Sequence, residues 1–235
     1  MTRSDWSDAF ADPAFALMVT ALVWVVASRL QKMVGSLLNP VLTSVVAIAT
    51  MLILADADYS SYKQGVNGLI VLLGPAVVAL ALPIRRNRGV IRAHSLGLFA
   101  GAIAGTVAGV VATVLIAQAA GLGPALGHTL APKHATSAVS AAVAGTTGGS
   151  ESLAAVISIL TGITGAVFAV PLLRLLRVRD SIVTGLSLGV SAHAIGTARA
   201  FDENPTAGAM SAVGMAIAAV AVPLVVALGV LTGAL

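Results

Sequence analysis

The segment from Gly185 to Arg199 carries polar chemistry within an otherwise apolar part of the chain. His193 lies in it, and an imidazole titrates close to neutral pH, so this side chain could hold and release a proton. Arg199 ends the segment, and a guanidinium can bind a carboxylate through two parallel hydrogen bonds. Three hydroxyl groups on neighbouring turns could donate hydrogen bonds to the same ligand: those of Ser187, Ser191 and Thr197.

Both charged side chains also have a structural alternative. A backbone carbonyl of a neighbouring helix could satisfy His193, and Arg199 could pair with Asp202 or Glu203 at the outer surface. For His193 we favour the functional interpretation, because ionisable groups inside a membrane usually take part in function.

A second polar segment, residues 132–137, follows a passage rich in glycine and proline. Lys133 comes directly after a proline, a residue suited to the first turn of a helix. Its ammonium group would then lie near free backbone N–H groups, which together favour an anion. Thr136 and Ser137 add hydroxyl donors, and His134 is a further candidate for lining the site. The alternative for Lys133 is an interfacial lysine that extends its ammonium group toward water.

Gly74 and Pro75 interrupt a third stretch, within the apolar residues 65–84. Such a pair can simply kink a packed helix. It can also unwind one, and in secondary transporters two such breaks at corresponding positions form the substrate site. Residues 73–79 and 188–194 both begin with Leu-Gly and continue with small residues, which favours the second interpretation.

The composition indicates which elements must position these residues. Of the 235 residues, 58% are hydrophobic and only 9% are charged, and the mean hydropathy is +1.00. A soluble domain carries roughly 25% charged residues. We therefore expect an all-α polytopic membrane protein that forms a single transmembrane domain over residues 1–235.

Several classes of function are excluded by the charges and by missing residue types. The net charge is +4, but the basic residues lie at the ends of apolar runs, which argues against nucleic acid binding. The sequence has no cysteine, so thiol catalysis and disulfides are excluded. It has no paired carboxylates within a span, no metal-ligand spacing and no phosphate-binding loop. We expect neither an enzyme nor a cofactor, while coupling to protons or sodium stays open.

We expect about seven transmembrane helices, because apolar segments recur that reach or approach the roughly 20 residues needed to cross a bilayer. Their approximate ranges are 14–28, 40–54, 65–84, 95–119, 153–173, the polar segment 185–199 and about the last 29 residues. In the fourth segment, small residues recur at every fourth position, which lets helix backbones approach closely inside the fold or in a homodimer. These residues are Gly97, Gly101, Gly105 and Gly109.

Basic residues mark cytoplasmic loops, and they orient these helices. They gather in three places, at residues 29–32, 85–92 and 174–179. This distribution predicts that the N-terminus lies outside the cytoplasm and that the passage 126–149 begins and ends outside. We therefore expect a re-entrant hairpin in which residues 132–143 enter the membrane and return.

The same orientation predicts an inverted repeat of residues 34–119 and 150–235. Each half would cross the membrane three times and contain a broken middle helix, at Gly74 in the first half and at Gly189 in the second. Two broken helices and a re-entrant hairpin are typical of secondary transporters and resemble the arrangement of elevator-type carriers.

These motifs resemble those of the LrgB/CidB (YohK-like) family, in the same order and over nearly the whole chain. The matching stretches lie at residues 73–83, 132–136, 148–153 and 185–199. Glu203 and Ser211 fit a glutamate and a serine of that family. This chain departs from the family's motifs only locally, at Ser137, Ala138 and residues 201–208. These differences affect the expected substrate contacts and not the membership of the family.

The resemblance implies one of two functions in a bacterial cytoplasmic (inner) membrane. Some members resemble carriers of small monocarboxylates: pyruvate in bacteria, and glycolate or glycerate in the chloroplast translocator that has a related LrgB half. Others are described as holin-like or antiholin-like regulators of murein hydrolase export and autolysis, which act with a small LrgA/CidA-type membrane partner. The expected partners are a small organic anion, the lipid bilayer, such a membrane protein and a second copy of this chain.

Of these two functions we favour the carrier. The anion would lie near mid-membrane between the hairpin and the two breaks, and Lys133 and helix N-termini would compensate its charge. His193 would carry the coupling proton. The expected substrate-binding residues are Gly74, Pro75, Lys133, Thr136, Ser137, Ser191, His193, Thr197 and Arg199.

Overall fold

The structure is a computed structural model that describes residues 3–34 and 38–235. Every regular element in these two ranges is a helix, as the composition predicts. The chain divides into two compact units, residues 1–79 and 80–235, and each is described by itself.

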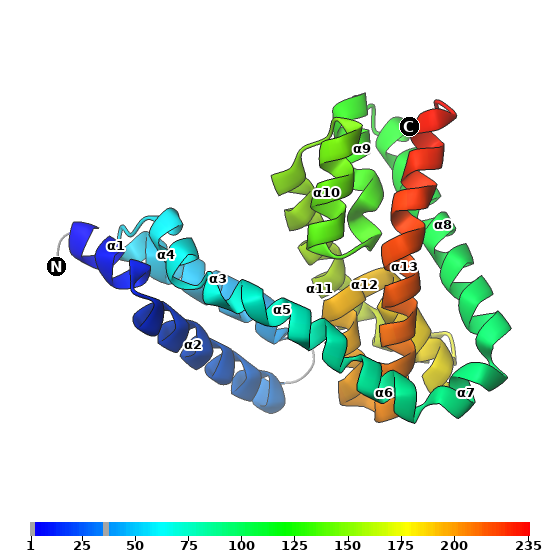
Figure 1. Cartoon of the computed structure of the whole chain (residues 1–235), viewed down its shortest axis with the longest axis horizontal. Helices are drawn as coiled ribbons and strands as arrows, with labels where there is room; N and C mark the ends of the chain where they lie inside the picture. The colour runs from blue at the N-terminus through cyan, green and yellow to red at the C-terminus, as the bar shows by residue number, and fades with distance from the viewer. Residues whose placement is uncertain (1–2, 35–37) are drawn as a thin grey trace. The chain divides into compact units, whose positions relative to one another are not determined.

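The described residues of the first unit form five helices, shown from blue to cyan in Figure 1: α1 (Arg3–Ala11), α2 (Pro13–Val34), α3 (Pro40–Leu54), α4 (Tyr59–Gly65) and α5 (Gly68–Ala79). Phe10 is buried in its core and meets the rings of Phe15 and Tyr62 edge-on, with centroids 5.4 and 6.1 Å away. α3 begins as predicted, because Asn39 Oδ1 accepts two backbone N–H groups of its first turn.

α5 runs without a break through Gly74 and Pro75, so the break predicted there was wrong. A Cβ atom added at Gly74 would meet no atom within 4 Å, which shows that this glycine serves no close approach within its unit. Pro75 removes one backbone donor, but a helix in a membrane protein tolerates that loss.

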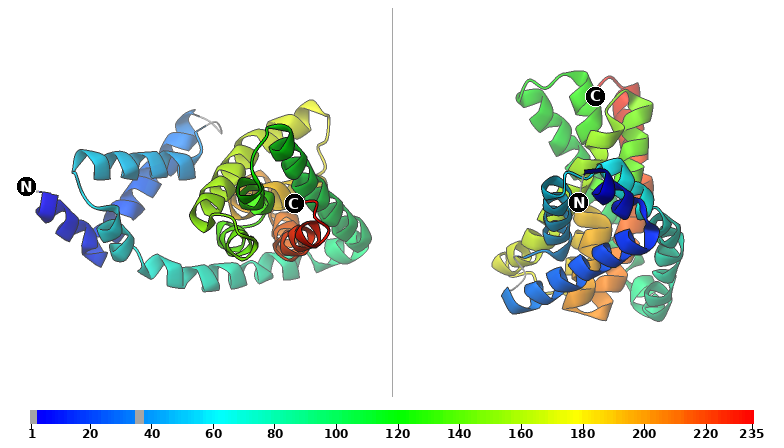
Figure 2. Two further views of the ribbon diagram at one scale, coloured as in Figure 1. Left: turned by 90° about the horizontal axis from the view of Figure 1, so that it is seen from above. Right: turned by 90° about the vertical axis from the view of Figure 1, so that its left-hand side faces the viewer.

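The second unit contains the two polar segments around Lys133 and His193. Its elements are α6 (Ala81–Arg86), α7 (Arg88–Ala93), α8 (Ser95–Ala119), α9 (Pro124–Leu130), the short 3₁₀ helix η1 (Ala131–His134), α10 (Ser137–Thr147), α11 (Glu151–Leu175), α12 (Ser181–Glu203) and α13 (Pro205–Leu231). α12 packs along α13 more extensively than any other pair of described elements, and Figure 2 shows the two side by side.

Two contacts show that α8 and α13 run in the same direction. Thr206, at the start of α13, donates from Oγ1 to Oδ1 of Asn87, which precedes α8 by a few residues (3.5 Å). At the other end of both helices, Gln118 Nε2 donates to the carbonyl oxygen of Ala234 (3.0 Å).

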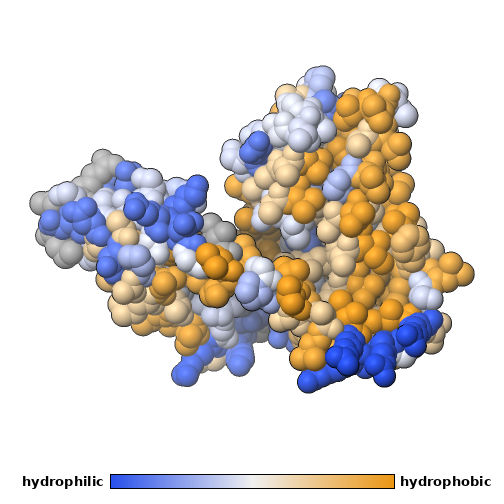
Figure 3. Space-filling view, in the orientation of Figure 1, coloured by the Kyte–Doolittle hydropathy of each residue, from blue (hydrophilic) through white to orange (hydrophobic). Residues whose placement is uncertain are grey.

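α11 runs in the opposite direction. Near its end, Arg174 Nη2 lies 2.8 Å from Glu203 Oε2, just before α13 begins. We call this end of the second unit the basic end, because the arginines of residues 85–92 and 174–179 lie there. In Figure 3 the hydrophilic surface of the second unit gathers over α6 and α7, and apolar residues cover most of the surface above them.

α12 does not cross the second unit but turns back on itself at His193. A straight helix of its 23 residues would be roughly 34 Å long. Its first residue, Ser181, nevertheless accepts a hydrogen bond from Nδ2 of Asn204, which directly follows its end (3.0 Å). His193 has φ 41° and ψ −125°, far from helical values. Residues 181–203 therefore form a helical hairpin, the second hairpin, with its base at the basic end.

This reversal corrects two predictions. The break lies at His193, four residues after Gly189, and the segment returns instead of crossing, so Glu203 lies at the basic end and not at the opposite one. The two limbs can lie this close because of Gly196, where a Cβ atom would collide with the carbonyl oxygen of Leu188.

A first hairpin, residues 124–147, starts from the end opposite the basic end. It consists of α9 and η1 as one limb and α10 as the other, and Ala135 and Thr136 make the turn in extended conformations. Its base is closed where the backbone N–H of Ser150 donates to Thr129 Oγ1 (2.9 Å). The chain thus reverses within the predicted range 126–149. Glu151 lies in the first turn of α11, where its carboxylate interacts favourably with the helix dipole.

Five described helices are long and apolar enough to cross a membrane: α2, α8, α11, α12 and α13. α3 is apolar but shorter, with 15 residues. α8 has the bounds that the sequence predicts, and α11 exceeds its predicted range by two residues at each end. Because α12 turns back at His193, the polar segment 185–199 is not one of the about seven predicted crossings, and the number of the others stays a prediction.

Candidate functional site

The turns of the two hairpins meet midway along α11. Ser158, in that helix, donates from Oγ to the carbonyl oxygen of Ala135 in the first hairpin (2.6 Å). The same Oγ lies 3.5 Å from Nε2 of His193 in the second. Since the Ser158 hydrogen is directed at the carbonyl, the imidazole is placed to donate to the hydroxyl oxygen. We call residues 133–137 and 191–197, where the hairpins meet, the tip region.

His193 occupies a backbone conformation that few side chains adopt. Its positive φ of 41° costs a residue other than glycine roughly 1–3 kcal/mol unless the surroundings enforce it. Only 4% of its surface is exposed. The ring lies against Gly162 of α11, where a Cβ atom would be 2.8 Å from Cε1, and Thr197 Oγ1 donates to the His193 carbonyl oxygen (2.8 Å). Contacts with Gly162 on the ring and with Thr197 on the carbonyl oxygen therefore keep His193 in its strained backbone conformation.

His134 has a matching environment in the first hairpin. Its ring lies against Gly109 of α8, where a Cβ atom would be 2.9 Å from Nε2, and Thr113 Oγ1 is 3.5 Å from the same nitrogen. In each hairpin, then, a histidine at the turn packs against a glycine of the preceding long helix and next to a hydroxyl. The His193 ring also lies near His134 and near the backbone carbonyl of Lys133.

Lys133 brings a positive charge to this region, and among the described residues no carboxylate pairs with it. Its side chain is half-buried. Lys133 precedes the N-terminus of α10 by four residues, and Thr136 Oγ1 caps that helix by accepting from the N–H of Val139. The backbone carbonyl of Lys133 lies beside the His193 ring, and the returning limb of α12 starts after this histidine. Free N–H groups at both N-termini and the ammonium group together favour an anion.

A cavity of about 390 Å³ lies beside the tip region. α8 contributes Gly101, Gly105 and Gly109, and a Cβ atom at each would lie within 3.3 Å of a side chain of this unit. These three glycines therefore serve packing within the fold, one of the two roles predicted for the row, whereas Gly97 has no neighbour within 4 Å. His134 and the hydroxyls of Ser187 and Ser191 are its polar lining, and the rest is aliphatic. It suits a small molecule with one polar end.

The structure brings together most of the predicted site residues. Six of them lie in the tip region: Lys133, Thr136, Ser137, Ser191, His193 and Thr197. Thr197 lies one turn further along and also contacts Ser211 Oγ (3.0 Å). Gly74 and Pro75 belong to the first unit and are described apart from this region.

Arg199 lies at the base of the second hairpin and not at its turn. It is within 2.6 Å of Glu203 Oε1, so the ion pair is the one of its two predicted roles that the structure contains. The pair lies at the basic end with Arg174, and not at the opposite end where it was predicted, because α12 reverses its direction.

Sequence reasoning missed Ser158 and Gly162, which hold the tip region from α11. The one available signal was that Ser158 is a hydroxyl inside a strongly apolar span, where it must find a partner within the protein. Which partner it finds depends on the hairpin that packs beside it.

We expect Ser158→Ala to destabilise the protein by about 1–3 kcal/mol, because it leaves the buried Ala135 carbonyl oxygen without its donor. Ser152→Ala, at an exposed position of the same helix, is the matched control and should have little effect. Thermal denaturation in detergent measures both. Equal melting temperatures would contradict the role given to Ser158.

A family model described as "LrgB-like family" matches residues 20–231. The chain is 31% identical to "Holin-like protein CidB" of Staphylococcus aureus (strain Mu50 / ATCC 700699) over 205 residues, 87% of this chain and 90% of that protein. It is 32% identical to "Uncharacterized protein YxaC" of Bacillus subtilis (strain 168) over 183 residues, 78% and 80% of the two chains. "Uncharacterized protein YwbG" of the same strain is 31% identical over 206 residues, 87% and 92% of the two chains. No solved structure matches the chain.

Proposed function

Since the chain belongs to the LrgB-like family, as its motifs predicted, and is a helical membrane protein, we propose that it carries small monocarboxylates of the pyruvate, glycolate and glycerate class across the cytoplasmic membrane. The observation that carries this proposal is the half-buried Lys133, which is unpaired within the described residues and shortly precedes the N-terminus of α10. Its carbonyl lies beside His193, where the returning limb of α12 starts. In the proposed mechanism the substrate carboxylate lies there, and no bond of the substrate is made or broken.

The proposal places both hairpins in the membrane. The first enters from the outside and the second from the cytoplasm, and the arginines of the basic end face the cytoplasm. The opposed hairpins support an inverted arrangement in which α8–α10 corresponds to α11 and α12, a different division from the repeats 34–119 and 150–235. The outside position of the N-terminus and a homodimer remain part of the proposal.

His193 carries the coupling proton in this mechanism. If sodium is the coupling ion instead, it would bind in the same tip region. The imidazole lies beside the carbonyl of Lys133, so its protonation state affects the charge at the anion position. Uptake would then depend on a proton gradient as well as on substrate concentration.

We expect Lys133→Met to reduce the uptake of labelled pyruvate into liposomes by about 10- to 100-fold, the factor that corresponds to losing one charge-assisted hydrogen bond of 1.5–3 kcal/mol. Lys133→Arg keeps the charge and should retain part of the uptake. Lys63→Met, at an exposed position in α4, is the control and should transport like the unaltered protein. Glycolate, glycerate and lactate as competitors define the substrate class. Uptake by the unaltered protein no faster than in empty liposomes would count against a carrier.

A second candidate function is favoured by the relatives' names. The protein of Staphylococcus aureus is called holin-like, and the comparisons support this function better than they support transport. In this alternative the chain regulates murein hydrolase export and autolysis together with an LrgA/CidA-type membrane partner. The tip region would then be structural.

The two functions differ in their dependence on Lys133. A holin-like regulator should change the autolysis rate of cells that express it, and Lys133→Met should leave that change intact. A carrier should transport as a purified protein without any partner. If expression of the protein changes the autolysis rate and the purified protein transports nothing, the second function is favoured.

A further inference from the structure

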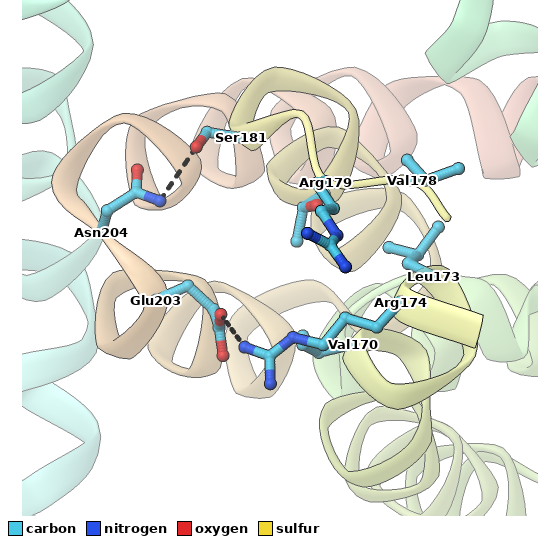
Figure 4. Close-up of a pocket in the computed structure, with 9 residues that line it drawn as sticks. Val170, Leu173, Arg174, Val178, Arg179, Ser181, Glu203 and Asn204 are labelled. Atoms are coloured by element: carbon cyan, nitrogen blue, oxygen red, sulfur yellow. Dashed lines mark hydrogen bonds and ion pairs between the residues drawn. The ribbon is translucent and has the colours of Figure 1, made fainter. Parts of the chain in front are cut away.

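A second polar hollow lies at the basic end, away from the hairpin turns. It has a volume of about 340 Å³ and lies between the end of α11, the loop after it and the base of α12. Figure 4 shows Arg174 and Arg179 bordering the same hollow, with Glu203, Ser181 and Asn204 along its other side. None of these residues belongs to the tip region.

The carboxylate and the side-chain amide oxygen that border this hollow already have partners. Glu203 forms an ion pair with Arg174 through Oε2 and another with Arg199 through Oε1. Asn204 Oδ1 accepts from the N–H of Ala207 (2.9 Å).

The donors, in contrast, are in surplus. Within the described residues, no carboxylate pairs with Arg179. Only Nη2 of Arg174 contacts Glu203, so other N–H groups of this guanidinium remain available. Ser181 Oγ accepts from Asn204, which leaves its own hydrogen free to donate. The hollow therefore offers donors from three segments, while its carboxylate and its side-chain amide oxygen already have partners.

The charges of this region are also unbalanced. Arg174 and Arg199 pair with one carboxylate, that of Glu203, and Arg179 pairs with none among the described residues, which leaves a net charge of +2 among these four residues. The carboxylate of the nearby Asp180 does not line the hollow, and its Oδ1 caps the N-terminus of α12 by accepting from Ile182 and Val183. Asp180 lines a different cavity, between α8 and α12.

We propose that this hollow binds a phosphate group. A dianionic phosphate has the charge and the number of acceptor oxygens to meet two guanidinium groups and a serine hydroxyl at once, whereas a carboxylate offers two oxygens and one charge. The group comes either from a soluble phosphate compound or from the headgroup of an anionic lipid, since basic pockets between helices at the cytoplasmic side bind such headgroups.

Phosphate at this position joins the end of α11 to the base of the second hairpin. It bridges Arg174 and Arg179 on one side and Ser181 at the start of α12 on the other. Because it binds only the folded arrangement, it raises the melting temperature. This inference does not depend on transport by the tip region.

The test is the melting temperature of the purified protein in detergent, with inorganic phosphate or chloride at equal ionic strength. We expect saturating phosphate to raise it by at least about 3 °C. Arg179→Gln should abolish this shift, and Arg179→Lys should leave part of it. Arg86→Gln, which removes an exposed arginine of α6 outside the hollow, is the control and should keep all of it.

A second arm distinguishes the source of the phosphate group. The protein is reconstituted in phosphatidylcholine vesicles with or without phosphatidic acid, and its melting temperature is measured again. A shift with inorganic phosphate assigns a soluble ligand, and a shift with phosphatidic acid alone assigns a lipid headgroup, provided that Arg179→Gln removes it. The proposal is overturned if neither probe shifts the melting temperature, or if Arg179→Gln and Arg86→Gln respond alike.

Discussion

We expect His193→Gly to be more stable than His193→Ala by about 1 kcal/mol, the reverse of the order at an ordinary helical position. Alanine at φ 41° keeps the steric strain of the native backbone, and glycine removes it. For a chain of this size the difference corresponds to a melting temperature roughly 2–4 °C higher for the glycine variant. Thermal denaturation of the two purified variants measures it.

Ala198→Gly is the matched control, because Ala198 is exposed on the returning limb of the same hairpin. There glycine should lower the stability by about 0.5–1 kcal/mol, as in any helix. If glycine destabilised position 193 as well, α12 would continue as a helix through His193, and the reversal would be wrong.

The glycine variant also separates the fold of the hairpin from the role of the imidazole. Under the proposed carrier function, His193→Gly keeps the turn but removes the proton-binding group. An imposed proton gradient should then no longer stimulate pyruvate uptake into liposomes. A gradient response equal to that of the unaltered protein would assign His193 a structural role.

The second large effect is expected for Gly189→Ala, which should destabilise the protein by about 1–3 kcal/mol or prevent its folding. A Cβ atom at Gly189 would collide with the carbonyl oxygen of Ser211 in α13 and lie 2.9 Å from the N–H nitrogen of Met215. These are backbone atoms, so a side-chain rotation cannot relieve the collision. α12 would have to move away from α13, its most extensive packing partner.

Gly97→Ala is the matched control for this prediction. A Cβ atom at Gly97 meets no atom within 4 Å. Alanine there should therefore raise stability by up to about 1 kcal/mol, since it lowers the entropy lost on folding. Melting temperatures that fall equally for both variants would contradict the close approach of α12 and α13.

The sequence predicted most of the long helices and the polar residues of the tip region. The apolar run 95–119 has the bounds of α8, and the Asn39–Pro40 start signal marks the beginning of α3. Lys133, Thr136 and His193 were identified because polar groups in so apolar a chain require partners or a ligand. The membrane class and the family followed from the same residues.

The direction of α12 could not be predicted in this way. Its 23 residues have the length and hydropathy of a crossing, and Gly189 is the residue that a search for breaks would select. The turn lies instead at a histidine, which local propensity disfavours at positive φ.

By itself, then, the sequence determined that this chain forms apolar membrane helices and which of its side chains can bind an anion or a proton. Only the tertiary structure decided where those side chains meet. The strained turn at His193 exists because Gly162 and Thr197 hold the histidine and because Gly196 lets the two limbs touch. These contacts join residues of different helices and limbs, so neither periodicity nor composition along the chain can show them.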